Sequence, residues 1–212
     1  MCWINGSLTR RSTQRESGHL ADLAGPRSFN NLRRLRSCPQ AIAHPRSLGV
    51  TEIVDLEMTH NIGHWQRRCA KGFDTLRVHI GFYDEHLSDA ISLGLRSGDS
   101  VPGCNGFVLT GPYKIVTDGS LGSQTAYCHE VYPGTDDHGL LAHPPRTLSD
   151  MIKRGTEHGF KMAVHAIGDQ ANHLALETIA AGPPPLPRST IEHAQLLDFD
   201  DLPLFSQLGQ IT

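Results

Sequence analysis

The sequence predicts an α/β fold in which helices connect the strands of a parallel sheet. Between residues 46 and 212, short runs rich in β-branched residues alternate with segments of helical spacing at least four times. A connecting helix returns the chain so that the next strand lies parallel to the last, which makes this alternation typical of parallel sheets. Two of the runs end in histidine, at His165 and His193. The pattern alone leaves a (β/α) barrel and an open doubly wound sheet as alternatives.

The composition fits one substantial domain and disfavours several classes of protein. The chain has 212 residues, of which 38% are hydrophobic and 19% are charged. Its net charge of −3 provides no electrostatic footprint for nucleic acid or for an anionic membrane. No apolar run approaches the roughly 20 residues that span a bilayer. The first residues lack the apolar stretch of a secretory signal, so we expect a cytoplasmic protein.

The cysteines are widely spaced and odd in number. No C-x-x-C pair occurs, which excludes a zinc ribbon and a thioredoxin motif. We therefore expect reduced thiols at all five positions, which are Cys2, Cys38, Cys69, Cys104 and Cys128.

The first 45 residues are poorly specified. Arginine and serine are dense there, and three prolines interrupt any long helix. The basic cluster Arg33, Arg34 and Arg36 suggests an RNA contact, but a solvated helix face is the better interpretation at this net charge. We expect this segment, 1–45, to precede a single domain that covers residues 46–212.

Regular elements are expected from residue 48 onward. Strands are predicted at 52–56 and 76–82, with one or two more within 106–119, because β-branched and aromatic residues cluster there. Helical spacing occupies 60–71 and 85–96. The stretch 119–145 is rich in Gly, Pro, Asp and His, and a loop of that length is usually functional or mobile.

The second half of the chain continues the alternation. Thr147 and Asp150 resemble a capping box at the start of a helix that Gly159 ends. A strand is predicted at 161–166, and Asp169 is expected to cap the helix after it. A strand at 190–194 and a short helix at 198–208 follow, and the last residues look like the beginning of another strand.

His165 and His193 are the strongest candidates for a functional role. Both lie at predicted strand ends one β/α unit apart, and parallel strands bring such ends to one edge. Neutral imidazoles suit Zn²⁺ and similar ions. Asp169 and Glu192 are near enough in sequence to accept the second N–H of a ligand histidine. The alternative for each histidine is a hydrogen-bonded strand-end residue that binds no metal.

Lys114 is unusual because it lies inside an apolar strand, where lysines are seldom buried unless paired. It is an edge lysine that reaches solvent, a salt-bridge partner, or a lysine modified into an anionic ligand. Asp118 follows in the same run and begins a turn of small residues that lets the backbone approach a bound group. Ser120 is not expected to be a hydrolase nucleophile because G-S-L-G is not the G-x-S-x-G elbow. The chain also lacks both common phosphate-binding glycine motifs, which disfavours a nucleotide-binding open sheet.

Four stretches occur in an order that resembles the amidohydrolase superfamily. They are KIVTDGSLGSQTA, GLLAHPP, VHAIGDQANHLALETI and STIEHAQ. The most similar branch is amidohydrolase family 3, of the N-substituted formamide deformylase or YtcJ-like kind, and the resemblance covers about residues 48–212. It implies a metal-dependent (β/α)₈ barrel that hydrolyses C–N bonds other than peptide bonds in a small-molecule amide, formamide or cyclic amide.

The resemblance also implies roles for individual residues. Lys114 corresponds to the strand-four lysine that becomes carboxylated, and His165 and His193 correspond to ligands on strands five and six. Together they would hold one or two divalent ions, for which zinc is expected. Such an ion would lower the pKa of a bound water and polarise the substrate carbonyl. The implied catalytic set is Lys114, Asp118, His165 and His193, with Asp169 and Glu192 in support.

The sequence departs from the family pattern in several places. No H-x-H pair occurs, the aspartate that ends the last barrel strand is missing, and Gln124 stands where many relatives have arginine. We therefore expect a partial TIM-like (β/α) barrel of roughly strands 2 to 6 with the start of strand 7. It would be an enzyme impaired by truncation, and a homo-oligomer is among the expected assemblies. The alternative is a catalytically inactive fragment that acts at most as a binding or interaction module.

Overall fold

The computed structural model describes residues 45–209 of the chain. The chain divides into two units, Met1–Ile53 and Val54–Thr212, and nearly all of the regular structure lies in the second. The segment predicted to be poorly specified, including its arginine cluster, lies outside the described residues except for Pro45. The predicted strand beginning at the last residues also lies outside them, apart from Gly209.

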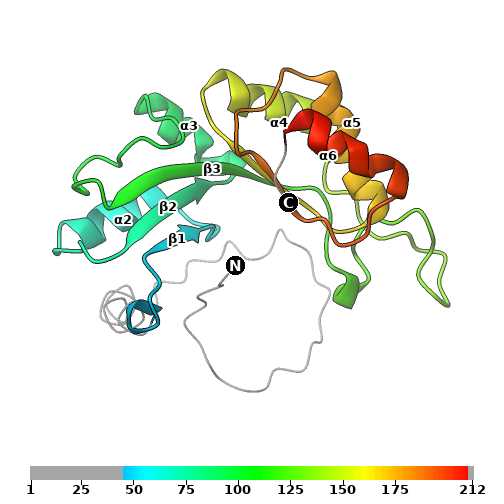
Figure 1. Cartoon of the computed structure of the whole chain (residues 1–212), viewed down its shortest axis with the longest axis horizontal. Coiled ribbons are helices and arrows are strands. Elements are labelled where there is room, and N and C mark those ends of the chain that lie inside the picture. The colour runs from blue at the N-terminus through cyan, green and yellow to red at the C-terminus, as the bar shows by residue number, and fades with distance from the viewer. Residues whose placement is uncertain (1–44, 210–212) are drawn as a thin grey trace. The chain divides into compact units, whose positions relative to one another are not determined.

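Five strands form one sheet with the shape of a half-barrel (Figure 1). They are β1 (Glu52–Asp55), β2 (Arg77–Phe82), β3 (Val108–Val116), β4 (Met162–Ala166) and β5 (Thr190–His193). Their order in the sheet is the order in the chain, and the pairs from β2 to β5 are parallel. A doubly wound sheet reverses its strand order at a switch point. The consecutive order therefore confirms the barrel-type alternative.

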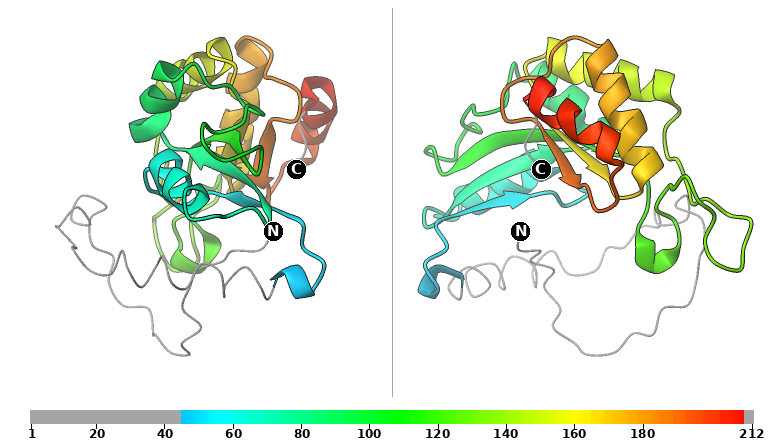
Figure 2. Two further views of the ribbon diagram at one scale, coloured as in Figure 1. Left: turned by 90° about the vertical axis from the view of Figure 1, so that its left-hand side faces the viewer. Right: turned by 45° about the vertical axis from the view of Figure 1, so that its right-hand side comes forward.

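Helices follow the strands and lie along the outer side of the half-barrel (Figure 2). They are α2 (Asn61–Cys69), α3 (Asp84–Ser92), α4 (Pro145–Glu157), α5 (Asp169–Ala181) and α6 (Leu202–Leu208), with short 3₁₀ turns at η2 (Leu121–Ser123) and η3 (Phe199–Asp201). Within the described part of the chain, no helix is both long and apolar enough to cross a membrane.

The core lies between the sheet and these helices. Alternate residues of the strands, such as Ile80, Ile115 and Val164, are at most 1% exposed, as expected where successive side chains point to opposite faces. Burial of this apolar surface is the main force that holds the helices on the sheet.

Tyr113 of β3 joins the sheet to two helices at once. Its hydroxyl donates a 2.8 Å hydrogen bond to Asp84 Oδ1, and Arg154 Nη1 donates to the same oxygen at 2.8 Å. Burial, followed by the hydrogen bond to Asp84, raises the pKa of Tyr113 well above its ordinary value. Gly155 admits the tyrosine ring, because a Cβ there would lie 2.8 Å from Tyr113 Cδ1. Helices α3 and α4 are thus positioned on β3 by one phenol.

The predicted elements are present, with differences at their ends. The helix expected from Thr147 begins at Pro145, because proline's fixed φ suits the first helical turn. Of the one or two strands predicted within residues 106–119, the structure has one. Asp169 is the first residue of α5 and not its cap, since Gly168 occupies the N-cap position without a side-chain cap hydrogen bond. The predicted helix at 198–208 is divided into η3 and α6.

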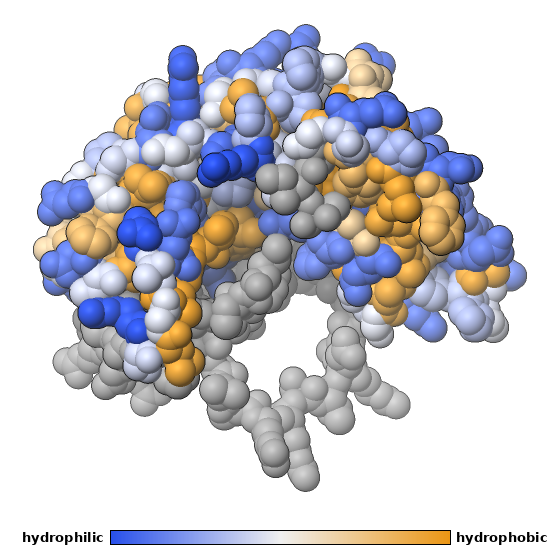
Figure 3. Space-filling view, viewed as in Figure 1, coloured by the Kyte–Doolittle hydropathy of each residue, from blue (hydrophilic) through white to orange (hydrophobic). Residues whose placement is uncertain are grey.

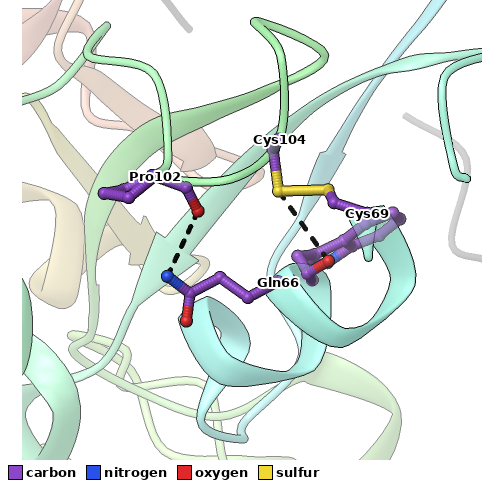
Figure 4. The surroundings of a disulfide bond; sticks show 5 residues. Gln66, Cys69, Pro102 and Cys104 are labelled. Atoms are coloured by element: carbon purple, nitrogen blue, oxygen red, sulfur yellow. Dashed lines mark hydrogen bonds between the residues drawn. A yellow bond between two sulfur atoms is a disulfide. The ribbon is translucent and has the colours of Figure 1, made fainter. Parts of the chain in front are cut away.

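Cys69 and Cys104 form a disulfide, with their Cα atoms 5.0 Å apart (Figure 4). The bond joins the end of α2 to the loop before β3, where Gln66 Nε2 also donates to the Pro102 carbonyl at 3.2 Å. The prediction of reduced thiols is therefore wrong for this pair. Periodicity and motif searches miss it because the two cysteines are 35 residues apart and match no spacing motif. Cys128 is free and buried.

Apolar side chains are exposed around the last described helix. Leu196, Phe199 and Leu202 are 36%, 89% and 46% exposed, and Figure 3 shows hydrophobic surface over α6 and the segment before it. An outer helix usually presents a polar face to water, and this region departs from that pattern.

We expect loss of the disulfide to lower the free energy of unfolding. In the chain-entropy model, a disulfide that closes a loop of this length stabilises the folded state by about 3–4 kcal/mol. Engineered disulfides often stabilise by less than this value. Urea unfolding of the wild-type chain with and without a reductant should therefore show a lower midpoint after reduction. The variant Cys69→Ser should start at the lower midpoint and no longer respond to the reductant. Equal midpoints for the oxidised and reduced chain would contradict the prediction.

Candidate active site

The parallel register brings three strand ends together. Val116 of β3 is paired with His165 of β4, and His165 is paired with Glu192 of β5. Lys114 lies two residues before Val116, and His193 directly follows Glu192. The sheet therefore gathers the predicted residues at one edge, although they are up to 79 positions apart in the sequence (193 − 114).

Lys114 is a buried salt-bridge partner. Only 4% of its side chain is exposed, and its Nζ is ion-paired with Glu192 Oε2, whose side chain is 11% exposed. Burial lowers the pKa of Lys114, and the negative charge of Glu192 opposes part of that decrease. Of the three interpretations left open for Lys114, the edge lysine that reaches solvent is wrong. Glu192, expected in support of a histidine, contacts the lysine instead.

A hydrogen bond to the backbone sets the tautomer of His165. Its Nε2 lies 3.2 Å from the Gly119 carbonyl oxygen, which only accepts hydrogen bonds, so Nε2 carries the hydrogen in the neutral ring. Nδ1 then keeps a lone pair. Thr117 holds the backbone of the same residue, because its hydroxyl donates to the His165 carbonyl at 2.5 Å. His165 is thus available as a ligand through Nδ1.

His193 reaches the site through an unusual backbone conformation. In a regular strand His193 would point to the face opposite Glu192, and thus opposite His165. Instead its φ is +77° and that of Ala194 is +43°, in the left-handed region that non-glycine residues seldom adopt. The rings of His193 and His165 consequently lie with centroids 4.6 Å apart in an edge-to-face arrangement. Strain of this kind clusters at functional sites.

The charge state of His193 suits metal binding. Partial burial of the ring lowers its pKa, and the neighbouring His165 and Lys114 lower it further. The imidazole is therefore kept neutral at neutral pH. Neutral imidazole is the form that binds metal ions.

Asp118 is a buried carboxylate beside His165. Its side chain is fully buried, and its oxygens accept hydrogen bonds from the backbone N–H groups of Tyr127, Ile167 and Gly168. One of these oxygens also lies 3.4 Å from His165 Nε2. The structure thus brings Asp118 together with His165, in contact with the backbone around it.

Asp169 has a separate role in the fold. Its Oδ1 accepts 2.8 Å hydrogen bonds from the backbone N–H groups of Gln170 and His129. These bonds tie the loop after β3 to the start of α5. The structure therefore places this carboxylate on the loop backbone, and not on a histidine ring.

Two glycines, expected from the sequence to lie in turns, and one threonine shape the site. A Cβ on Gly119 would lie 1.9 Å from Thr125 Oγ1, and a Cβ on Gly168 would lie 2.0 Å from the Tyr127 carbonyl oxygen. Both positions therefore require glycine for close packing of the loop. The dipeptides Asp118-Gly119 and Gly168-Asp169 are the sequence signal for these tight turns. Nothing in the sequence singled out Thr117.

A second group of histidines and carboxylates lies where the loop after β3, α5 and η3 meet. His173 Nδ1 is 3.0 Å from Asp201 Oδ1, and its Nε2 is 3.4 Å from Glu177. His129 Nε2 is 3.2 Å from Asp198, and the two imidazole centroids are 6.2 Å apart. The hydrogen bond to Asp201 is the main factor that raises the pKa of His173. This group links three segments through contacts between imidazoles and carboxylates.

Comparisons with known proteins identify relatives of the chain. A family model described as the amidohydrolase family matches residues 6–211. The "Putative amidohydrolase YtcJ" of Bacillus subtilis (strain 168) is 41% identical over 138 residues, which are 63% of this chain and 24% of that protein. The Protein LONG AFTER FAR-RED 3 of Arabidopsis thaliana is 39% identical over 138 residues, or 63% of this chain and 23% of that protein. The chain thus matches about a quarter of the length of these curated relatives.

Two solved structures share the fold at higher coverage of this chain. The crystal structure of an uncharacterized metal-dependent hydrolase from Pyrococcus furiosus has a TM-score of 0.69 and 26% identity, covering 81% of this chain and 35% of that one. The corresponding hydrolase from Pyrococcus horikoshii OT3 has a TM-score of 0.70 and 26% identity, with coverages of 83% and 35%. The half-barrel matches about a third of each of those chains.

We expect the backbone strain at His193 to be measurable. Replacement by glycine relieves the left-handed conformation, whereas replacement by alanine keeps it, and both remove the imidazole. His193→Gly should therefore be more stable than His193→Ala by about 0.5–1 kcal/mol, after the greater unfolded-state entropy of glycine is included. Urea unfolding of both variants measures the difference. An alanine variant as stable as the glycine variant, or more so, would show that the residue is unstrained.

The contacts of His173 predict a pH dependence of stability. A pKa raised on folding adds stability that is complete below the ordinary value of about 6.5 and is lost as pH rises through the folded-state pKa. The difference in unfolding midpoint between wild type and His173→Gln should therefore be larger at pH 5.5 than at pH 8.5. The exposed His158, changed in the same way, serves as the control. A difference that stays constant over this range would contradict the prediction.

Proposed function

Because the chain belongs to the amidohydrolase family, we propose that it is a metal-dependent hydrolase that cleaves a non-peptide C–N bond. The observation that carries the proposal is the adjacent pair of His165 and His193 beside Lys114, at the carboxyl ends of parallel strands. That edge is where barrel enzymes place their chemistry. The metal-dependent hydrolases among the structural neighbours support a divalent ion.

The chemistry of the donor set fits such an ion. His165 offers Nδ1 because its Nε2 is committed to a carbonyl, and His193 is kept neutral. Within residues 45–209, His, Cys, Asp and Glu side chains alone form no group of three that could hold a metal ion. A third ligand from this region would therefore be Lys114, after its neutral amine has added CO₂ and released a proton to become an anionic carbamate. Burial favours that neutral amine, since it lowers the pKa of Lys114.

Glu192 would control whether Lys114 takes this role. In its ion pair the lysine is an ammonium group with no lone pair to react. A carbamate at the same place would face the Glu192 carboxylate and be repelled. The side chain of Glu192 would therefore have to turn away or take up a proton before Lys114 became a ligand.

The bound ion would supply a water of lowered pKa and polarise the carbonyl of the substrate. We propose Zn²⁺, in one or two sites, and a small-molecule amide, formamide or cyclic amide as the substrate. Imidazole ligands agree with zinc. The chain's own residues would hold the ligands in place through the Thr117 and Gly119 contacts to His165.

Further expectations remain proposals. The net charge supports a protein that binds neither nucleic acid nor membrane. The apolar surface at Leu196, Phe199 and Leu202 supports a homo-oligomer. A cytoplasmic location is also proposed, although the Cys69–Cys104 disulfide weighs against a reducing compartment.

A binding module without catalysis is the second candidate function. The specific observation in its favour is the Lys114–Glu192 ion pair, which satisfies the lysine without a metal. In that case the strand edge would bind a small molecule or another protein, but hydrolyse nothing.

Metal content and hydrolysis together test the proposal. The purified chain, dialysed against Zn²⁺ and then buffer, should retain stoichiometric metal by elemental analysis, and the double variant His165→Ala/His193→Ala should retain none. The matched control is His86→Ala/His158→Ala, two histidines away from the strand ends, which should bind metal like the wild type. Hydrolysis of a panel of amides should follow metal content, measured as amine release for formamides and acyl amides and as ring opening for cyclic amides. Metal that survives the loss of both histidines would overturn the site, and metal without hydrolysis would favour the binding module.

A further inference from the structure

Asp118 is the most completely bonded carboxylate in the described part of the site. None of its side chain is exposed. Its Oδ2 accepts from Tyr127 N at 3.0 Å and Gly168 N at 2.8 Å, and Ile167 N lies 3.0 Å from Oδ1 and 3.3 Å from Oδ2. The Oδ1 atom also lies 3.4 Å from His165 Nε2. Each oxygen of this carboxylate thus has at least two protein nitrogens within 3.4 Å.

These donors come from two segments that meet around His165. Ile167 and Gly168 form the turn between β4 and α5, just after the histidine, and Tyr127 belongs to the loop after β3. The loop is packed against the turn so closely that Gly168 has no room for a Cβ. A single carboxylate therefore fixes the path of the chain leaving His165 and the loop that covers it.

The same carboxylate faces the ring itself. His165 Nε2 donates to the Gly119 carbonyl, and Asp118 Oδ1 adds a second acceptor on that side of the ring. Both groups that face Nε2 accept hydrogen bonds and neither donates one. The ring hydrogen must therefore be on Nε2. Nδ1 therefore keeps its lone pair, in a ring whose centroid lies 4.6 Å from that of His193.

From this geometry we propose that Asp118 is a positioning residue, which holds His165 in the Nε2–H tautomer and orients Nδ1 as a ligand, rather than a group that reacts with substrate. The inference rests on the proposed function only in taking His165 as a ligand. A general base needs a free lone pair within reach of the substrate proton. The lone pairs of Asp118 are directed to backbone N–H groups and to the ring.

Asparagine at this position separates the two roles. Its single oxygen is expected to take the place of Oδ2, which has the shorter bonds to Tyr127 and Gly168, and its NH₂ then replaces Oδ1. That NH₂ would face the N–H of Ile167 and the Nε2–H of His165. All three groups are hydrogen-bond donors, so no hydrogen bond could form between them. Asp118→Asn should therefore shift His165 toward the Nδ1–H tautomer, in which Nδ1 no longer binds a metal.

The first measurement needs no metal and no activity. Imidazole ¹⁵N spectra of the ¹⁵N-labelled whole chain, with His165 assigned from the signals lost in His165→Gln, should show Nε2 protonated and Nδ1 unprotonated in the wild type. Asp118→Asn should move the His165 signals toward the other tautomer. A wild-type His165 protonated at Nδ1 overturns the proposal directly, even if the variant fails to fold.

The second measurement is the affinity for Zn²⁺ alone, by competition with a chromophoric chelator. Loss of a contact that orients a metal-ligating histidine typically weakens binding 10–100-fold, and we expect Asp118→Asn to fall in that range. The matched control is Asp201→Asn, another buried carboxylate that contacts a histidine, His173. It should lower stability yet leave the His165 tautomer and Zn²⁺ affinity unchanged.

The outcomes distinguish this inference from the proposed function. An Asp118→Asn variant with wild-type tautomer and affinity, whether or not it hydrolyses amides, shows that Asp118 does not position His165. Equal effects of Asp118→Asn and Asp201→Asn on affinity would show a general loss of stability instead. A wild-type chain that binds no Zn²⁺ overturns the proposed function, while the tautomer shift still supports the positioning of His165.

Discussion

Parallel pairing of β3, β4 and β5 in a fixed register places Lys114, His165 and Glu192 on one face of the sheet. In a parallel sheet, residues paired across neighbouring strands share a face, and the carboxyl ends of the strands share an edge. The other contacts of the site depend on this arrangement. A shift of one residue in the register would turn the side chains of a whole strand to the opposite face and would separate the lysine from its partner. The conformation of His193 has meaning only in this context, because the left-handed turn returns to the site a side chain that the register would direct away.

The two buried carboxylates of the site are held in different ways. Asp118 is bound by backbone N–H groups that cannot move without unfolding the β4–α5 turn. Glu192 is bound by one flexible ammonium group, that of Lys114. A buried charge is tolerated when it is paired or hydrogen-bonded, and both carboxylates meet that condition. The first is a permanent part of the framework, whereas the second has a partner that can change its chemical state. One edge of the sheet therefore combines a rigid support with an exchangeable contact.

Much of the fold could be predicted from local sequence, but little of the geometry of the site could. The strands predicted at 76–82 and 161–166 are compact apolar runs, so their positions follow from local patterns. The choice between barrel and open sheet requires the strand order, which local patterns do not contain. The partnership of Lys114 with Glu192 joins residues 78 positions apart. The sequence offered a salt bridge as one of three alternatives for the lysine, but it named no partner and placed Glu192 beside a histidine. The left-handed backbone of His193 was not predictable either, because non-glycine residues seldom adopt it and nothing in the local sequence marks this position.

The disulfide has a practical consequence for how the protein is made. Cys104 precedes β3 and Cys69 precedes β2, so the bond lies toward the amino ends of these strands, whereas the histidines lie at the carboxyl ends. Oxidation therefore affects how much of the chain is folded, without altering the groups that would do the chemistry. Expression in a reducing cytosol would yield a smaller fraction of folded protein with the same intrinsic properties. Export to an oxidising compartment, or refolding with a thiol–disulfide buffer, is the appropriate route to material for quantitative work.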